Sequence, residues 1–214
     1  AKGQLDVNSL ITERVDLKDF NEIYGEMGKG GSIASILTYP APAAAPKRSV
    51  SVTERAFAAG SGTMGIIGAG NFTKAMILPS LKKASAPIKY ISSAGGLSGT
   101  TAAQKFGVGQ SITDNRIMLD DPDLDAVLIT TRHNSHAKQV IEALEAGKHV
   151  FVEKPLALTH DDLDRIDAAY QNTDKTLTVG FNRRFSPFSQ DLKKQLGDAP
   201  GPINVIATMN AGFI

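Results

Sequence analysis

A glycine-rich turn is the first part of the sequence with recognisable chemistry. Gly68 and Gly70 follow a short apolar run expected to be a strand, and Asn71, Phe72 and Thr73 open an expected helix. In a dinucleotide-binding turn, the first glycine permits the tight turn and the second lets the backbone approach a pyrophosphate. The helix N-terminus then offers N–H groups to the phosphates. An ordinary glycine turn is the alternative, but the flanking strand and helix favour nucleotide binding by all five residues.

Thr73 is the one departure from the usual pattern of this turn. The third position is commonly Gly or Ala, since a small residue allows close packing of helix and strand. A threonine there is expected to hold the two elements slightly further apart.

The end of the second expected strand bears on the type of cofactor. Many dinucleotide domains carry Asp or Glu there, about 20 residues after the turn, for the ribose 2′-hydroxyl. Residues 92–96 here read Ser-Ser-Ala-Gly-Gly, with no carboxylate to repel a 2′-phosphate and no arginine to bind one. NAD and NADP both stay open. Ser93 is predicted to contact the cofactor, with a slight preference for NADP.

A polar segment with two histidines follows a buried strand expected at 126–131. Ligands of open α/β sheets bind outside the carboxyl ends of strands, and residues 130–136 lie at such an end. We predict that Thr130, Thr131, His133 and His136 flank the nicotinamide side of the site. A lone histidine is more often structural, but two in one turn favour function.

Charged residues end two further apolar strands. Glu153-Lys154-Pro155 places a charged pair where burial is costly unless the charges are paired or used, and Pro155 restricts the backbone of Lys154. We predict that Lys154 is catalytic and that it and Glu153 contact the cofactor, against the alternative of a surface ion pair. Arg184 is predicted to bind phosphate or substrate, or only to hold the next segment by ion pairs.

Alternating strands and helices must position these residues. The apolar patterns place strands at 63–67, 88–93, 126–131, 149–152 and 176–181, and helices at 71–84, 100–106, 135–146 and after Thr159. Pro79 is expected to kink or restart the first of these helices. Strands that alternate with helices predict an α/β protein with a doubly wound parallel sheet.

Four regions are expected along the chain. Residues 1–40 hold a helix at 16–24 and a strand at 32–39, too little for a core of their own. Residues 41–61, rich in Pro and Ala, predict an extended linker, or else an ordered loop wrapped on the next domain. Residues 62–184 are the dinucleotide-binding domain, and 185–214 begin a second domain with a strand at 201–209.

Composition excludes several classes of function. The 214 residues carry a net charge of +1, which argues against nucleic acid or an anionic membrane as the main partner. The absence of cysteine excludes disulfides and zinc–thiolate sites, and no metal site is predicted. No apolar run approaches the roughly 18 residues that span a bilayer. We expect a cytoplasmic protein.

Taken together, the motifs resemble the Gfo/Idh/MocA oxidoreductases. Gly68-Ala69-Gly70, the turn ending at His136, Glu153-Lys154-Pro155 and residues 180–185 occur in that family's order and approximate spacing, within Gly62–Ile214. The resemblance implies a Rossmann-like domain and a hydride moved between NAD or NADP and a hydroxyl or carbonyl, often of a sugar or cyclitol. It places Lys154 near the nicotinamide and the reacting oxygen. Arg132 departs from the family, which usually has proline there.

The first 40 residues resemble the C-terminal tail of zinc-type, medium-chain alcohol dehydrogenases. This resemblance implies that the chain spans the junction of a two-enzyme fusion. The resemblance to the Gfo/Idh/MocA family implies that the chain is a fragment, in which the second domain's Asp and His for proton transfer are missing. Such a fragment is expected to bind nucleotide, to self-associate as a homo-oligomer and to turn over a sugar-like substrate poorly. The alternatives are a non-catalytic NAD(P)-binding regulatory or scaffold protein and a naturally short protein.

Overall fold

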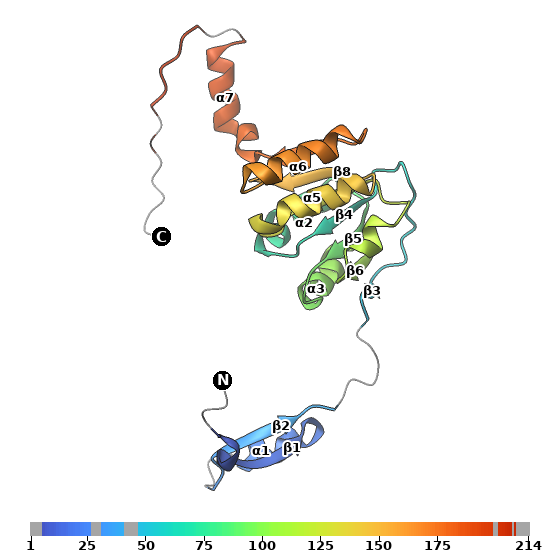
Figure 1. Ribbon diagram of the computed structural model, residues 1–214, viewed down its shortest axis with the longest axis vertical. Helices are drawn as coiled ribbons and strands as arrows, with labels where there is room; N and C mark the ends of the chain where they lie inside the picture. The colour runs from blue at the N-terminus through green and yellow to red at the C-terminus, as the bar shows by residue number, and fades with distance from the viewer. Residues whose placement is uncertain (1–5, 27–30, 41–46, 199–200, 207, 209–214) are drawn as a thin grey trace. The chain divides into compact units, whose positions relative to one another are not determined.

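The chain forms two compact units in a computed structural model (Figure 1). The units are Ala1–Lys47 and Arg48–Ile214. The structure describes residues 6–26, 31–40, 47–198, 201–206 and 208. Among these residues, no helix combines the length and the apolar character needed to cross a membrane.

The first unit is a small parallel βαβ arrangement. Strands β1 (Ile11–Asp16) and β2 (Ala34–Thr38) pair in parallel. The connection between them contains two helical turns, η2 (Leu17–Asp19) and α1 (Phe20–Glu26), after an initial turn η1 (Asn8–Leu10). The helix and second strand match the sequence patterns. β1 was not predicted, because Thr-Glu-Arg near its start conceals the strand alternation.

The second unit is built on a seven-stranded sheet in the order β3-β6-β5-β4-β7-β8-β9. All neighbouring strands run parallel except β3, which is antiparallel to β6. The strands are β3 (Ser49–Ser51), β4 (Met64–Ile67), β5 (Ile88–Ser92), β6 (Gln110–Ile112), β7 (Ala126–Ile129), β8 (His149–Glu153) and β9 (Leu177–Gly180). The chain leaves β4 toward β5 and β6, then returns to β7 on the other side. This is the Rossmann-like order, and it confirms the predicted doubly wound sheet.

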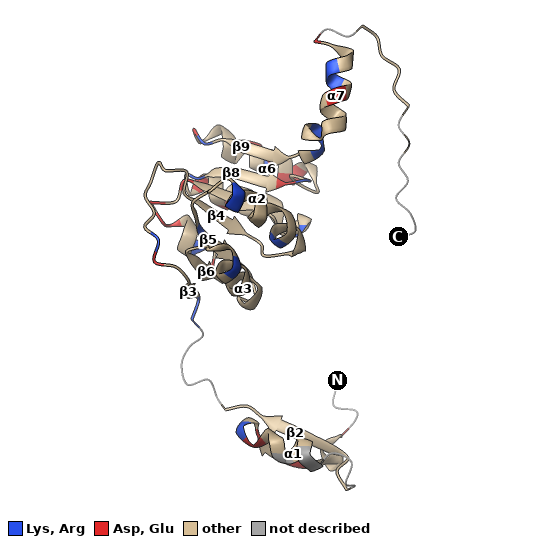
Figure 2. Cartoon of the chain, turned by 180° about the vertical axis from the view of Figure 1, so that it is seen from behind, with Lys and Arg blue, Asp and Glu red and all other residues tan. Residues whose placement is uncertain are grey.

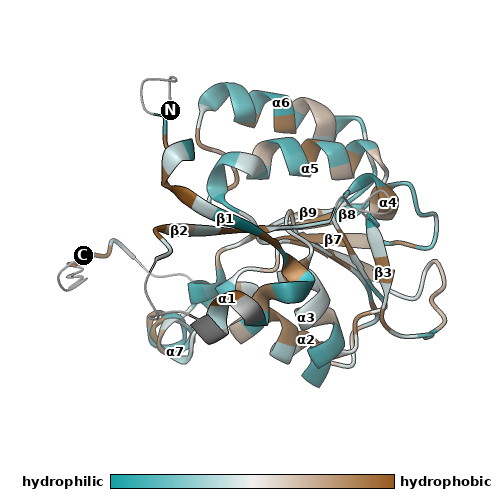
Figure 3. Cartoon of the chain, turned by 90° about the horizontal axis from the view of Figure 1, so that it is seen from below, coloured by the Kyte–Doolittle hydropathy of each residue, from teal (hydrophilic) through white to brown (hydrophobic). Residues whose placement is uncertain are grey.

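Helices cover both faces of this sheet (Figure 3). α5 (His136–Glu145) and α6 (His160–Gln171) lie on one face, and their side chains share a core with β7 and β8. α2 (Leu78–Lys83) and α3 (Leu97–Phe106) cover the other face, where Leu78 and Ala103 pack with Ile66 and Ile91. The sheet is thus buried on both sides, as its apolar strands require.

The helix after β4 is interrupted, as the sequence predicted at Pro79. Residues Thr73–Ile77 form a π-helical turn, η3, and α2 starts again with the proline in its first turn. Pro79 has no N–H to donate, and its ring would clash with the preceding turn of a regular helix. The wider π turn relieves this clash.

Part of the predicted linker belongs to the sheet. Ser49–Ser51 form β3 at its edge, and the N–H groups of Val52 and Thr53 donate to the carbonyl of Gly109. The extended-linker interpretation is therefore wrong from Arg48 onward, and the alternative of an ordered segment on the domain holds there. Residues 41–46 lie outside the described part of the chain.

Residues 182–198 add two helices, and the strand predicted beyond them is not observed in the described residues. η5 (Asn182–Phe185) leads into α7 (Pro187–Leu196), which has Ser186 as its N-cap. Residues 201–206 form no helix or strand, and Ile206 is exposed. A strand needs a neighbour to satisfy its backbone groups, and no described strand pairs with this segment. α4 (Arg116–Leu119) completes the unit.

Candidate dinucleotide-binding cleft

A cavity lies where the strand order reverses, at the carboxyl ends of the strands. Its volume is about 710 Å³. Four groups of residues form most of its lining: 67–70 after β4, 92–95 after β5, 113–116 after β6, and Thr131, Gln139 and Glu142 from the β7–α5 side. Arg48, Ser98 and Leu119 complete it. Ligands of doubly wound sheets bind at this position.

The two glycines of the β4 turn face this cleft in different ways. Gly68 has φ of +110°, and a Cβ there would lie 2.9 Å from the carbonyl carbon and oxygen of Thr130. Only glycine fits that backbone conformation. A Cβ on Gly70 would meet no atom within 4 Å. The space beside Gly70 is therefore open, which agrees with the prediction that a pyrophosphate approaches the backbone there.

Thr73 ties the turn to the neighbouring strand instead of facing the cleft. Its side chain is fully buried, and its hydroxyl lies 2.8 Å from that of Thr130. The Thr130 hydroxyl donates in turn to the carbonyls of Ile67 and Gly68. The Thr73 side chain is thus buried and used within the protein, while a contribution of its backbone N–H to cofactor binding stays a prediction. Thr130 likewise holds the backbone of the glycine turn through its hydroxyl.

The end of β5 is held by polar contacts inside the cleft. Ser92 is buried and donates to Oδ1 of Asn115 at 2.6 Å. Ser93 lines the cleft, and its Oγ accepts the N–H of Gly99 in α3 at 3.1 Å. No carboxylate lies on residues 92–96, but the structure brings two arginines to the cleft, Arg48 and Arg116. Residues 92–96 themselves contain no arginine, but arginines from other segments reach the same cleft.

Thr131 joins the cleft to the start of α5. Its hydroxyl donates to Oε1 of Gln139 at 2.6 Å and accepts from Ser135 at 2.9 Å. Thr131 and Gln139 both line the cavity, so this network presents oriented polar groups to a ligand.

The two histidines do not form part of the cleft lining. His136 is fully buried, with Nδ1 2.7 Å from the carbonyl oxygen of Pro155 and Nε2 3.1 Å from that of Thr131. The His136 side chain is therefore closed off from the cleft, and it links α5 to the loop after β8. His133 is exposed, and its ring packs edge-on against His136.

Glu153 and Lys154 lie at the carboxyl end of β8, beside the end of β7. The Lys154 side chain is exposed, and no ion pair joins it to Glu153 or to another described residue. The surface ion pair considered from sequence is thus not observed. Glu153 is half-buried and packs at Gly180 of β9, where a Cβ would lie 3.0 Å from Oε1 of Glu153. A glycine at that position leaves room for the carboxylate.

The remaining predicted residues lie outside the cavity lining. Asn71 and Phe72 are exposed in the first turn of the helix after β4. Arg184 is exposed in η5, with its guanidinium 5.4 Å from the ring centroid of Phe185. Neither ion pair nor cleft contact is observed for Arg184 within the described residues.

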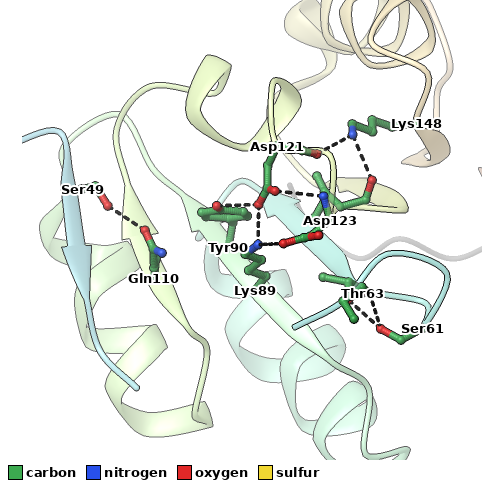
Figure 4. Close-up of polar contacts among 11 residues, drawn as sticks. Ser49, Ser61, Thr63, Lys89, Tyr90, Gln110, Asp121, Asp123 and Lys148 are labelled. Carbon is green, nitrogen blue, oxygen red and sulfur yellow. Dashed lines mark hydrogen bonds and ion pairs between the residues drawn. The ribbon is translucent and has the colours of Figure 1, made fainter. Parts of the chain in front are cut away.

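The charged residues that carry clear pKa shifts lie at the opposite, amino-terminal edge of the sheet (Figure 4). Asp121 accepts from the hydroxyl of Tyr90 and pairs with Lys89, each at 2.7 Å. Burial acts to raise the pKa of Asp121, but the hydrogen bonds from Lys89 and Tyr90 outweigh it and lower that pKa. Burial and the same carboxylate raise the pKa of Tyr90. This network stabilises the fold, far from the cleft.

A family model decides between the open interpretations of the cleft. Residues 63–181, more than half of the chain, match the oxidoreductase family with an NAD-binding Rossmann fold, Gfo/Idh/MocA. The chain belongs to this family. The matched range contains the β4 turn, the cleft strands and Glu153-Lys154-Pro155, so the resemblance stated from sequence is confirmed.

Several of the relatives that this chain matches are dehydrogenases of polyols or sugars. The chain is 41% identical to myo-inositol 2-dehydrogenase of Thermotoga maritima over 91 residues, which are 42% of this chain and 27% of that protein. It is 36% identical to scyllo-inositol 2-dehydrogenase (NAD⁺) of Bacillus subtilis over 103 residues, 47% of this chain and 30% of that protein. The chain thus spans less than a third of the length of these two relatives.

Solved structures in the family agree with the fold. Levoglucosan dehydrogenase in complex with NADH and L-sorbose aligns with a TM-score of 0.57 and 34% identity, over 63% of this chain and 38% of that chain. A 3-ketoreductase from Actinomadura kijaniata in complex with NADP aligns with a TM-score of 0.58 and 25% identity, over 63% of this chain and 43% of that chain. The family therefore includes proteins with either nicotinamide cofactor.

Several cleft residues of this family member were missed from sequence. Asn115, Arg116, Gln139 and Glu142 line the cavity, and Arg48 joins them from before the matched range. The polar run Thr113-Asp114-Asn115 after an apolar Ile112 was the available signal, but the strand before it is only three residues long. The likeness of the first 40 residues to alcohol dehydrogenases stays a prediction.

Proposed function

We propose that the second unit binds a nicotinamide dinucleotide in the cleft and belongs to an enzyme that moves a hydride between NAD(P) and a hydroxyl or carbonyl of a polyol or sugar-like compound. The observation that carries this is the pair Gly68 and Gly70 at the switch point of the sheet. Gly68 is fixed by its close approach to Thr130, whereas Gly70 leaves a space that a Cβ would enter. That space, inside a cleft of about 710 Å³, fits a pyrophosphate.

In this proposal, the cofactor supplies the site that takes up or gives the hydride. The reaction also needs a group that moves the proton of the substrate hydroxyl. Lys154 is suited to that role, because it lies at a strand end beside the cleft and its ammonium has no described ion-pair partner. Thr131 and Gln139 would orient the ligand through their hydrogen-bond network.

The substrate class is supported by the family relatives. Their names specify inositols and levoglucosan, which are compounds rich in hydroxyl groups. The prediction of a homo-oligomer is supported by apolar side chains exposed on η5 and α7, among them Phe185, Phe188 and Leu192.

Calorimetric titration of the 214-residue chain with NAD(H) and with NADP(H) tests the binding proposal. The chain has no tryptophan, so intrinsic protein fluorescence would report poorly. We expect at least one of the two cofactors to bind. A folded chain that binds neither would contradict the proposal.

Substitution of Lys154 tests its proposed role. With a panel of inositols and anhydrosugars, we expect Lys154→Met to lower the turnover of the enzyme that contains this unit by about 100-fold or more, because general acid–base groups contribute that much. Cofactor affinity should stay within about two-fold, with Lys83→Met, an exposed lysine on α2 outside the cleft lining, as the control. Turnover that Lys154→Met leaves unchanged would remove this residue from the mechanism.

A further inference from the structure

We propose that Arg48, which precedes the family's matched domain, completes the cofactor cleft and favours a dinucleotide with a 2′-phosphate over one without it. The inference rests on the proposed function and specifies its cofactor. The matched family range begins at residue 63, so the residue that discriminates would come from a segment outside that range.

The edge strand β3 brings Arg48 to the carboxyl edge of the sheet. β3 runs antiparallel to β6, with Ser49 opposite Ile112, so the start of β3 lies beside the end of β6. The carbonyl of Arg48 accepts the N–H of Thr113 at 3.0 Å. Because the cofactor cleft opens at the ends of β4, β5 and β6, this register places Arg48 on its rim.

One hydrogen bond orients the Arg48 side chain and leaves its other donors available. Its Nη1 donates to Oδ2 of Asp114 at 3.0 Å, while the other oxygen of Asp114 accepts the N–H of Arg116 at 3.0 Å. The Arg48 side chain is 73% exposed, so most of its five N–H donors remain available. A guanidinium held in this way is suited to a phosphate, which it can bind through two parallel hydrogen bonds.

The charges of this corner favour an anion. Arg48, Arg116 and Asp114 all line the cleft, and together they carry a net positive charge. The other carboxylate in the lining, Glu142, comes from α5, across the switch point from β5 and β6, and its oxygen lies 3.8 Å from Nζ of Lys138. Basic and acidic segments both occur over the helices of the unit (Figure 2). The positive charge around Arg48 is therefore confined to this part of the cleft.

The end of β5 leaves room for the extra phosphate. NAD-binding domains commonly place a carboxylate there, where it binds the ribose 2′-hydroxyl and repels a phosphate. Here Ser93, Ala94, Gly95 and Ser98 line the same cleft as Arg48. A Cβ on Gly95 would meet nothing within 4 Å. Small residues, and an arginine that directly precedes β3, thus replace the carboxylate.

Titration of the full chain with NADP⁺ and with NAD⁺ at equal ionic strength tests this inference. Arg48→Met keeps an unbranched side chain and removes the guanidinium group with its charge. We expect it to weaken NADP⁺ binding about ten-fold or more and NAD⁺ binding less than about three-fold. Arg55→Met is the matched control, because Arg55 lies on the same segment over the ring of Phe57 and outside the cleft lining. It should change neither affinity.

Each outcome separates the inference from the proposed function. Arg48→Met that weakens both cofactors equally, or that leaves NADP⁺ affinity unchanged, overturns the role of Arg48 while binding itself stands. A wild-type chain that binds neither cofactor overturns the proposed function and this inference together. Circular dichroism and the thermal unfolding midpoint verify that each variant is folded. Little change is expected in either, because the Arg48 side chain is mostly exposed.

Discussion

Gly68 and Gly70 lie two residues apart, but their missing side chains serve different purposes. Gly70→Ala would place a methyl group in the open cleft without a clash, so we expect a folded protein of nearly unchanged stability. The same methyl group would occupy the space of the pyrophosphate. We therefore expect affinity for NAD(P)H to fall by about ten-fold or more, measured by calorimetry.

Gly68→Ala is the matched comparison for that prediction. Its Cβ would clash with the Thr130 backbone at a φ of +110°, so it should lower the thermal unfolding midpoint as well as the affinity. Cofactor affinity that survives Gly70→Ala would show that the dinucleotide does not approach this turn.

At the level of elements, His136 joins the start of α5 to the loop that carries Lys154. His136→Ala would leave a cavity and would deprive the carbonyls of Thr131 and Pro155 of a buried partner. We expect the free energy of unfolding in urea to fall by about 2–4 kcal/mol. His133→Ala, next to it on the surface, should change it by no more than about 0.5 kcal/mol. Equal effects of the two substitutions would contradict a linking role for His136.

The sequence predicted the strands well where each forms a clear apolar run. β4, β5, β7, β8 and β9 lie within one or two residues of their predicted positions, because buried parallel strands are short apolar runs. β3 and β6, each of three residues, were missed. Gln110-Ser111-Ile112 has too little apolar character to be distinguished from a loop, and β3 exists because the edge of β6 offers it backbone partners.

The site could be predicted only where its residues adjoin a motif. The sequence located the β4 turn, Ser93 and Thr131, which line the cleft. It could not place Arg48 or Glu142, because their contribution depends on how distant segments meet. It also assigned Thr73 and His136 to the ligand, since a polar residue in a functional loop looks the same in sequence whether it faces the ligand or is buried beneath it.

At the level of the second unit, the two edges of the sheet carry different tasks. The carboxyl edge holds open space, glycines and exposed charges, whereas the amino edge holds a dense polar network. There Lys148 is buried and its ammonium donates to the carbonyls of Asp121 and Leu124. Substitutions at the amino edge should therefore change stability without changing the chemistry of the cleft.

The ion pair between Lys89 and Asp121 makes the stability of the unit depend on pH. Because the folded-state pKa of Asp121 is lowered, the unfolded chain binds its proton first as the pH falls. The stabilisation is complete above the ordinary pKa of 3.8 and is lost as the pH falls through the lower folded value.

At neutral pH, Asp121→Asn should lower the free energy of unfolding by about 2 kcal/mol, since charged hydrogen bonds contribute that much. This deficit should shrink in urea titrations as the pH falls below 3.8. Asp123→Asn, at a more exposed partner of Lys89, is the control with a smaller expected effect. A deficit independent of pH would show that Asp121 contributes through packing and not through its charge.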